Sequence, residues 1–134
     1  MKFLKSFLFL YGMVKSFTSS TGITIKIGER DVENDQLIKN AQQNYIWCHL
    51  DNMSSPHAII ECPDPDPATL NDALQLVKYY SKGKNAKNLN VIYTEIKNVA
   101  MDFHKAGLVH LRKEPCKKGI RTDYSCLRKY GLTF

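Results

Sequence analysis

The chain has 134 residues, of which 43% are hydrophobic and 24% charged, and its formal net charge is +6. This length fits one domain whose core needs neither disulfides nor a structural metal, and the composition excludes a disordered chain. Residues 1–72 contain six Lys or Arg and nine Asp or Glu, whereas residues 73–134 contain thirteen and four. The basic half predicts an electropositive surface that attracts phosphates, with a merely solubilising face as the alternative.

The N-terminal residues Met1 to Val14 place two lysines ahead of a short apolar run. This run is too short to span a membrane, which takes roughly 20 apolar residues, and it lacks the small-residue cleavage site of a signal peptide. We therefore expect residues 1–12 to be an upstream extension ahead of a start at Met13, and no membrane partner.

Two patterns predict the first half of a sheet. Residues 23–27 alternate apolar and polar side chains up to Gly28, which is typical of a strand with one buried face. Polar residues follow, and a short helix is expected around Leu37 and Ile38. Residues 45–50 and 57–61 are apolar and are joined by turn residues, so they predict an antiparallel pair.

The strongest helix signal follows a proline-rich loop. Asp66 suits the N-cap and Pro67 the first helical position, and Gly83 is the expected end. One apolar stripe repeats at helical spacing: Leu70, Ala73, Leu74 and Val77. Lys78 and Lys82 are expected in the last turn on a shared face.

Further strands are expected at residues 91–96 and 108–112, followed by an irregular basic segment. The elements predict an α+β single domain with a largely antiparallel sheet and two helices, in the approximate order β-β-α-β-β-α-β-β. We divide the chain into an extension (1–12), a folded domain (13–113) and a basic C-terminal tail (114–134).

Two basic clusters are the candidates for nucleic-acid binding. Lysine ammonium groups on flexible stems suit sequence-independent contact with phosphates, and the affinity of such contact falls steeply with salt. The predicted phosphate contacts are Lys78, Lys82, Lys84, Lys87, Lys97, Arg112, Lys113, Lys117 and Lys118. Tyr79, Tyr80 and Tyr93 lie near these clusters and could stack on bases, but for each a core position is favoured.

Metal binding and catalysis are both disfavoured by spacing. The set Cys48, His49, His57 and Cys62 follows no structural-zinc pattern, and neighbours on a strand point to opposite faces. A hydrolase built on Cys48 and His57 is the enzymatic alternative, but nothing indicates an orienting third group or an oxyanion hole. We expect free thiols, no cofactor, no metal, no catalytic residue and no enzymatic activity.

Six segments, in order, resemble the NFACT RNA-binding domain over residues 14–113, with a layout similar to its small stand-alone coiled-coil-domain-containing branch. They are Phe17–Ser20, Gly28 with Glu33, Asn34 and Leu37, Ile46–His49, Ser54–His57, Val91–Thr94, and Lys97–Val99 with Gly107 and Val109. The resemblance implies RNA binding in the cytoplasm, linked to ribosome-associated quality control. It assigns a structural family-motif role to Gly28, Asn34, Trp47, His49, His57, Tyr93, Asn98 and Gly107.

The predicted function is therefore a non-catalytic protein that binds the backbone of structured or ribosomal RNA. Two alternatives stay open from the sequence. The partner could be DNA, or the domain could dock on a ribosomal or quality-control protein.

Overall fold

The computed structural model describes residues 14–134, so the predicted extension 1–12 lies outside the described residues. The elements are β1 (Lys15–Thr18), β2 (Thr24–Gly28), α2 (Asp31–Asn40), β3 (Ile46–Leu50), β4 (His57–Ile60), α3 (Pro67–Tyr79), β5 (Leu89–Glu95), the 3-10 turn η1 (Ile96–Asn98), β6 (Val99–Met101), β7 (Val109–Leu111), β8 (Cys116–Ile120) and α4 (Tyr124–Lys129).

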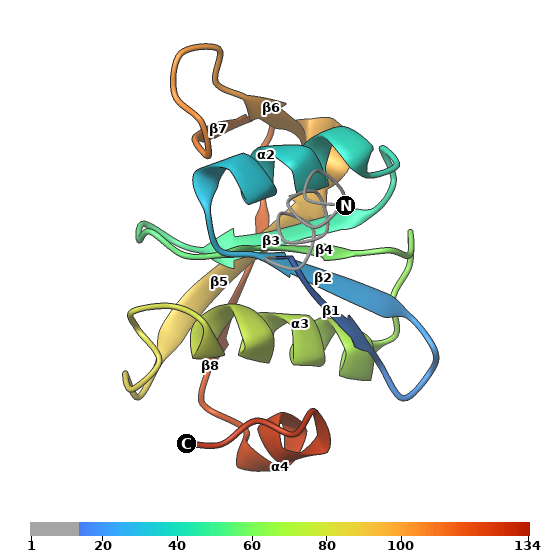
Figure 1. The fold of residues 1–134 in the computed structure, drawn as a ribbon, viewed down its shortest axis with the longest axis vertical. Coiled ribbons are helices and arrows are strands. Elements are labelled where there is room, and N and C mark those ends of the chain that lie inside the picture. The colour runs from blue at the N-terminus through green and yellow to red at the C-terminus, as the bar shows by residue number, and fades with distance from the viewer. Residues whose placement is uncertain (1–13) are drawn as a thin grey trace, which may run out of the picture.

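Six strands form one antiparallel sheet in the order β1-β2-β4-β3-β5-β8, and β6 pairs with β7 in a separate two-stranded ribbon. Helix α2 and the β6–β7 ribbon cover one face of the sheet (Figure 1). Helix α3 covers the other face, and α4 packs outside α3. The predicted α+β fold with an antiparallel sheet is confirmed.

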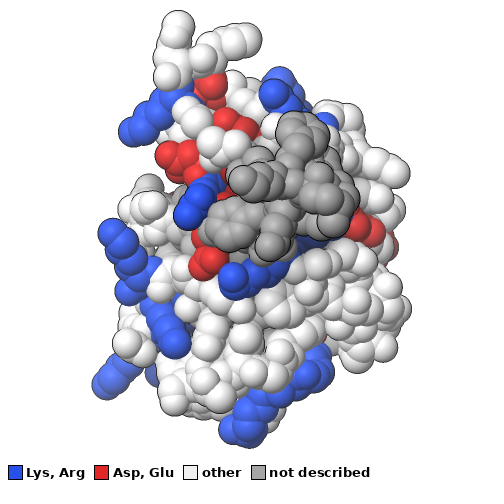
Figure 2. Space-filling view, in the orientation of Figure 1, with Lys and Arg blue, Asp and Glu red and all other residues white. Residues whose placement is uncertain are grey.

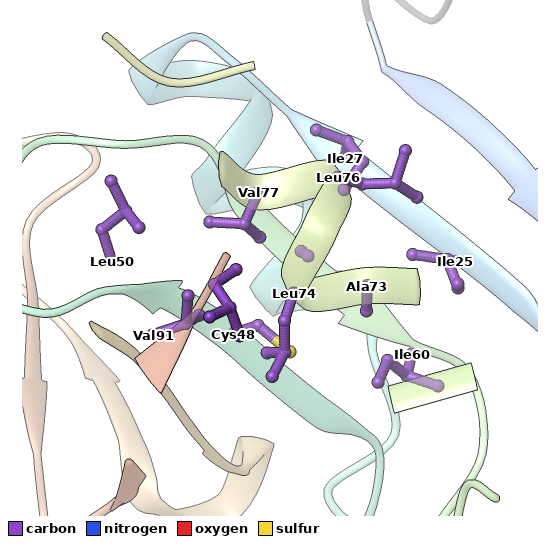
Figure 3. Close-up of a cluster of buried hydrophobic side chains, with 12 residues drawn as sticks. Ile25, Ile27, Cys48, Leu50, Ile60, Ala73, Leu74, Leu76, Val77 and Val91 are labelled. Carbon is purple, nitrogen blue, oxygen red and sulfur yellow. The ribbon is translucent and has the colours of Figure 1, made fainter. Parts of the chain in front are cut away.

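Strand alternation divides the apolar side chains between two cores. On the α3 side, Ile25 and Ile27 of β2 are fully buried together with Leu74 of α3 (Figure 3). On the α2 side, Trp47 and Ile59 pack beneath the helix. Burying one such side chain stabilises the fold by about 1.5–3 kcal/mol, so the period-two pattern determines which residues of each strand hold the two layers.

Helix α3 begins as predicted and ends earlier than predicted. The Asp66 carboxylate accepts a hydrogen bond from the Thr69 backbone N–H at 3.1 Å, and Pro67 occupies the first turn. The expected end at Gly83 is wrong, because the helix stops at Tyr79 and the Ser81 hydroxyl donates to the carbonyl oxygen of Lys78 at 2.7 Å. Lys82 therefore lies outside the helix.

The segment after Lys113 is ordered, which contradicts the predicted irregular structure. Strand β8 pairs with β5 over five residues, from Leu89↔Ile120 to Tyr93↔Cys116. The β8 sequence carries no alternating apolar pattern, since only Ile120 is buried. Its extended state comes from backbone pairing with β5, an interaction that local sequence does not encode. Helix α4 follows as a third helix, beyond the two expected.

Three buried polar residues of α3 hold this C-terminal segment: Asp72, Gln75 and Lys78, spaced three apart. We call them the polar stripe of α3. The Gln75 side chain donates to the carbonyl oxygen of Arg121 at 2.6 Å and accepts from the Asp123 backbone N–H at 2.9 Å. Residues at this spacing share a helix face, so α3 packs on apolar groups on one side and on polar groups on the other.

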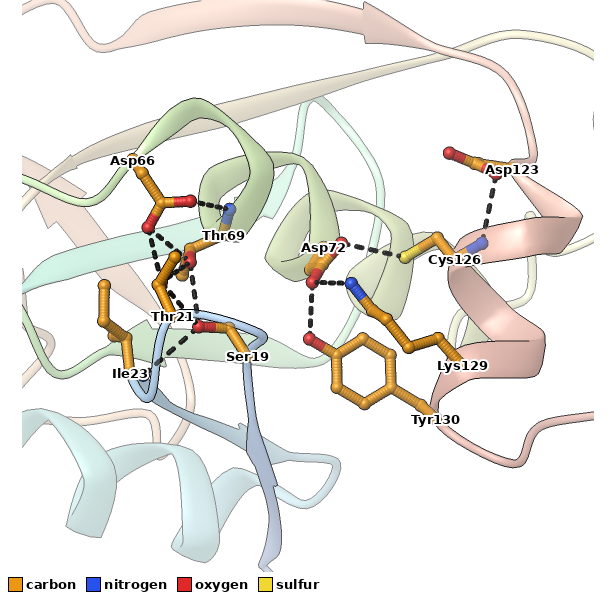
Figure 4. A network of polar contacts seen from close by, with 10 residues as sticks. All are labelled: Ser19, Thr21, Ile23, Asp66, Thr69, Asp72, Asp123, Cys126, Lys129 and Tyr130. Carbon is orange, nitrogen blue, oxygen red and sulfur yellow. Dashed lines mark hydrogen bonds and ion pairs between the residues drawn. The ribbon is translucent and has the colours of Figure 1, made fainter.

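Asp72 is the centre of the contact between α3 and α4 (Figure 4). Its carboxylate accepts hydrogen bonds from the Cys126 thiol at 3.1 Å, from the Lys129 ammonium at 2.7 Å and from the Tyr130 hydroxyl. Burial, together with the hydrogen bond to Asp72, raises the pKa of the Cys126 thiol to about 12. The network keeps that thiol protonated and ties α4 to α3.

Replacing Asp72 by Ala removes the acceptor of three donors at once. We expect the variant to lose about 3 kcal/mol in the free energy of unfolding, because polar groups at a buried contact lose their partner. Urea unfolding followed by circular dichroism measures this. Lys129→Met is the control and should lose less than about 1 kcal/mol, because that ammonium is half exposed. Equal stability of Asp72→Ala and the wild type would contradict the assigned role.

Candidate nucleic-acid interface

Three aromatic residues of β3 and β4 form a compact group, in which Trp47 and His57 are buried and His49 is partly buried. The indole N–H of Trp47 donates to Nδ1 of His57 at 3.0 Å. The rings of Trp47 and His49 stack with centroids 5.6 Å apart, and His49 meets His57 edge to face at 4.8 Å. Because Nδ1 of His57 is an acceptor, the neutral imidazole carries its proton on Nε2. The structure thus brings together the histidines and the tryptophan of the resemblance.

Two glycines allow other elements to approach this group. A Cβ on Gly28 would lie 2.6 Å from Oδ1 of Asn34, the oxygen that faces the His57 backbone N–H at 3.4 Å. Gly107 has φ +81°, and a Cβ there would lie 2.5 Å from the Asp31 carboxylate. Only glycine permits so close an approach of α2 to the β7 side of the ribbon.

Of the six motif residues that meet here, Asn34, His49, His57 and Gly107 line one hollow of about 460 Å³. Its rim carries both signs of charge, with Glu29 and Asp31 facing Lys82 and Lys105. Mixed charge of this kind gives phosphates little net attraction. The two remaining motif residues lie elsewhere: Tyr93 packs on the α3 side, and the Asn98 amide donates to the Thr94 hydroxyl at 3.1 Å.

Cys48 and His57 lie on opposite faces of the sheet, Cys48 toward α3 and His57 toward α2. Burial raises the pKa of the Cys48 thiol well above its ordinary value, and burial followed by the charge of His49 lowers the pKa of His57 to about 3. The imidazole therefore cannot take the proton of this thiol. Within residues 14–134, no group of three His, Cys, Asp or Glu side chains is placed to hold a metal ion.

Lys78 is not available for phosphate contact, which corrects its assignment from sequence. The side chain is 1% exposed, and its ammonium donates to the carbonyl oxygen of Lys84 and to the hydroxyl of Thr122, both at 2.7 Å. Burial lowers the pKa of this lysine. The four-residue spacing predicts a face shared with Lys82, but the loop after α3 and the C-terminal segment cover Lys78.

Several of the other predicted cations lie on or beside β8, at one edge of the sheet, whereas Lys82 lines the hollow beside His57. Strand β8 is an edge strand, because it pairs with β5 alone, and it carries Lys117 and Lys118. The antiparallel register brings its C-terminal end beside the loop that follows α3, where Arg121 donates to Asn88 Oδ1 at 3.1 Å. In the segment between β7 and β8, Arg112 donates to the carbonyl oxygen of Lys97.

These cations differ in how far they are neutralised. Lys117 pairs with Asp51 at 2.9 Å, and Lys97 lies 3.7 Å from Glu95. No carboxylate among residues 14–134 forms an ion pair with the rest of the set, namely Lys82, Lys84, Lys87, Arg112, Lys113 and Lys118. Figure 2 shows Lys and Arg side chains at the lower left, near the loop after α3, and along the bottom around α4, whereas acidic side chains gather near the start of α2.

Sequence reasoning missed two exposed aromatic residues of the C-terminal segment, Tyr124 and Phe134, which are each 53% exposed. The tyrosines singled out instead have other contacts. Tyr80 packs against Phe17 and the α3-side core, and the Tyr79 hydroxyl donates to the carbonyl oxygen of Thr133 at 2.6 Å. Only the position of Tyr124 and Phe134 within the basic tail could have indicated them.

The fold and the grouped motif residues define a domain class that comparison with known proteins identifies. Residues 13–111 match the family described as the NFACT protein RNA binding domain, so the chain belongs to this family. Coiled-coil domain-containing protein 25 of Danio rerio is 36% identical over 116 residues, which cover 76% of this chain and 56% of that protein. The Rqc2 homolog RqcH of Bacillus subtilis is 30% identical over 88 residues, 65% of this chain and 15% of the relative.

The chain thus spans about half the length of its coiled-coil domain-containing relative, and its similarity to that protein agrees with the predicted stand-alone branch. The C-terminal part of the fibronectin/fibrinogen-binding protein of Streptococcus suis shares the fold, with a TM-score of 0.80 at 21% identity over 87% of this chain and 48% of that one. No helix within residues 14–134 is long and apolar enough to cross a membrane.

The buried His57 predicts acid sensitivity. Its pKa is about 3 in the folded state against 6.5 for an ordinary imidazole, so the unfolded chain takes up a proton first as pH falls. The contribution of His57 to the free energy of unfolding is fully present above the pKa of the unfolded chain. It is lost progressively as the pH falls from that value toward the pKa of the folded state. We expect a loss of about 2 kcal/mol between about pH 7.5 and pH 5 from this residue, and His49 adds to it with the same sign.

Urea unfolding at several pH values measures this dependence. His57→Gln should show a shallower fall in stability over the same range, at a lower stability overall because the ring that packs against Trp47 and His49 is lost. The control is His104→Gln, which replaces an exposed imidazole and should retain the wild-type slope. A wild-type stability that does not change over this pH range would contradict the neutral, buried state of His57.

Proposed function

We propose that the protein is a non-catalytic RNA-binding protein whose exposed cations along β8 and the loop after α3 contact the phosphate backbone. The observation that carries the proposal is the group of cations without ion-pair partners on and beside β8 and in the loop after α3. This arrangement attracts a polyanion and does not require a folded groove. The description of the family as an RNA-binding domain supports RNA as the polyanion.

Backbone contact is favoured over base reading by the type of residue. Lysine is a compact charge on a flexible stem, whereas reading of base edges takes groups held in a fixed geometry. Structured or ribosomal RNA offers a dense array of phosphates for such an edge. The relationship to Rqc2 homologues supports a role linked to ribosome-associated quality control.

A protein partner is the second candidate function, and one feature favours it. Phe103, in the loop between β6 and β7, is 100% exposed, and Leu108 of the same loop is 41% exposed. Exposed apolar side chains at the end of a projecting ribbon are typical of docking contacts. This loop lies at the end of the molecule opposite α4 (Figure 1), so the two functions would use separate surfaces.

The test compares two triple variants that remove the same net charge. Replacing Lys87, Lys113 and Lys118 by Gln should weaken RNA binding uniformly across sequences. It should also lower the slope of log K against log salt by about 0.7–0.9 for each phosphate that the variant no longer neutralises. Fluorescence anisotropy across a salt series measures both effects.

The control replaces Lys15, Lys26 and Lys39 by Gln, on β1, β2 and α2, where two of the three are already paired with glutamates. We expect this triple to change the affinity by less than about twofold, since paired surface charges contribute little. If both triple variants weakened RNA binding equally, the affinity would depend on the net charge of the protein and not on the position of the lysines. Absence of any binding at low salt would overturn the proposed function.

A further inference from the structure

A second hollow of about 460 Å³ lies between the loop after α3 and the C-terminal segment. Its lining residues are Lys84, Asn85, Ala86, Lys87, Arg121, Thr122, Tyr124 and Phe134. Three of these described residues are cationic and none is Asp or Glu. In contrast to the hollow beside His57, this one therefore presents a single sign of charge, which favours an anionic ligand.

Aromatic rings form part of its wall. The rings of Tyr124 and Phe134 meet edge to face with centroids 5.2 Å apart, and Phe134 also meets Tyr79 at 5.7 Å. Half of the surface of Tyr124 and of Phe134 is open to solvent. Aromatic surface that stays in water does not gain the stabilisation of burial. The exposed face of an aromatic ring beside cations is a surface on which a nucleic-acid base stacks.

The hollow is held in shape by contacts to buried groups. The Lys78 ammonium binds the Lys84 carbonyl oxygen on one wall and the Thr122 hydroxyl on the other, both at 2.7 Å. The Lys84 ammonium lies 4.2 Å from the centroid of the Tyr79 ring and 4.9 Å from that of Phe134. Groups that are already positioned lose less conformational entropy when a ligand binds.

We infer that this hollow holds a single unpaired nucleotide, whose base stacks on the face of Tyr124 and meets Phe134 edge to face, while the flanking phosphates contact Lys87 and Arg121. The inference rests on the proposed function and adds a preference to it, for unpaired over fully paired RNA. A base within a duplex has both faces covered by its neighbours, so only an unpaired base can stack on protein rings. The volume is at the small end of ligand pockets and suits one base.

The combination of cations and aromatic rings favours a nucleotide over an acidic peptide in this hollow. An acidic peptide would engage the three cations but would leave the two rings without a flat partner, whereas a nucleotide satisfies both. In addition, Arg121, Tyr124 and Phe134 lie beyond residues 13–111, the part of the chain that matches the family. The stacking surface is therefore supplied by the C-terminal segment rather than by the matched domain.

The experiment measures binding of the full chain to a labelled oligouridine of about 12 nucleotides and to an RNA duplex of the same length, by fluorescence anisotropy. The wild type should bind the single strand more tightly. Tyr124→Leu should weaken single-strand binding by on the order of tenfold because the base then has no ring to stack on, and leave duplex binding and the salt slope unchanged. Phe134→Leu should weaken it in the same direction.

The matched control is Phe103→Leu, which removes a fully exposed ring at the opposite end of the molecule and should leave single-strand binding unchanged. Arg121→Gln should weaken binding to the oligouridine and lower its salt slope by about one. Because Tyr124 and Phe134 are half exposed, both leucine variants should unfold at nearly the wild-type urea concentration, which confirms that weaker binding does not come from unfolding.

The outcomes separate the inference from the function on which it rests. If neither RNA binds at low salt, both fail. If both RNAs bind with the expected salt slope but equally well, and Tyr124→Leu changes neither, the proposed function stands and the nucleotide site is overturned. Displacement of oligouridine by polyglutamate with equal potency in the wild type and Tyr124→Leu would assign the hollow to an acidic peptide, and would overturn the inference as well.

Discussion

The buried polar stripe of α3 is the constraint on which the C-terminal half of the structure depends. Asp72, Gln75 and Lys78 are almost fully excluded from solvent, and their side chains bond to the C-terminal segment. Polar groups buried in this way are costly unless they find partners, so the segment must pack where it does. No buried side-chain N or O atom within residues 14–134 is left without a partner.

This constraint separates the parts of the chain that hold the fold from those that meet a ligand. The motif residues around Trp47 and His57 are buried and join α2 to the sheet, so their side chains serve packing. The predicted cations without ion-pair partners, and the exposed rings of Tyr124 and Phe134, lie on the loop after α3 and on the segment that follows β7. The stripe of α3 brings those two regions together, because Lys78 bonds to both.

The sequence was sufficient to predict those parts of helices and strands that depend on interactions between neighbouring residues. The cap at Asp66 and the proline after it predicted the start of α3, because both act within one turn. The alternation at residues 23–27 predicted β2, since the sheet must bury one face of it. The predicted end of α3 was wrong because Ser81 terminates the helix by bonding to Lys78, two residues ahead of the expected glycine.

The sequence alone determined the fold class, the family and the uneven distribution of charge, because hydrophobic period, capping residues and composition are properties of neighbouring positions. Only the tertiary structure decided which charges are free. Lys78 has the sequence context of a surface lysine, yet it is buried by residues 6 and 44 positions away. Strand β8 likewise exists only through its pairing with β5. Contacts between distant residues depend on how whole helices and strands pack together, and a local sequence pattern does not predict that packing.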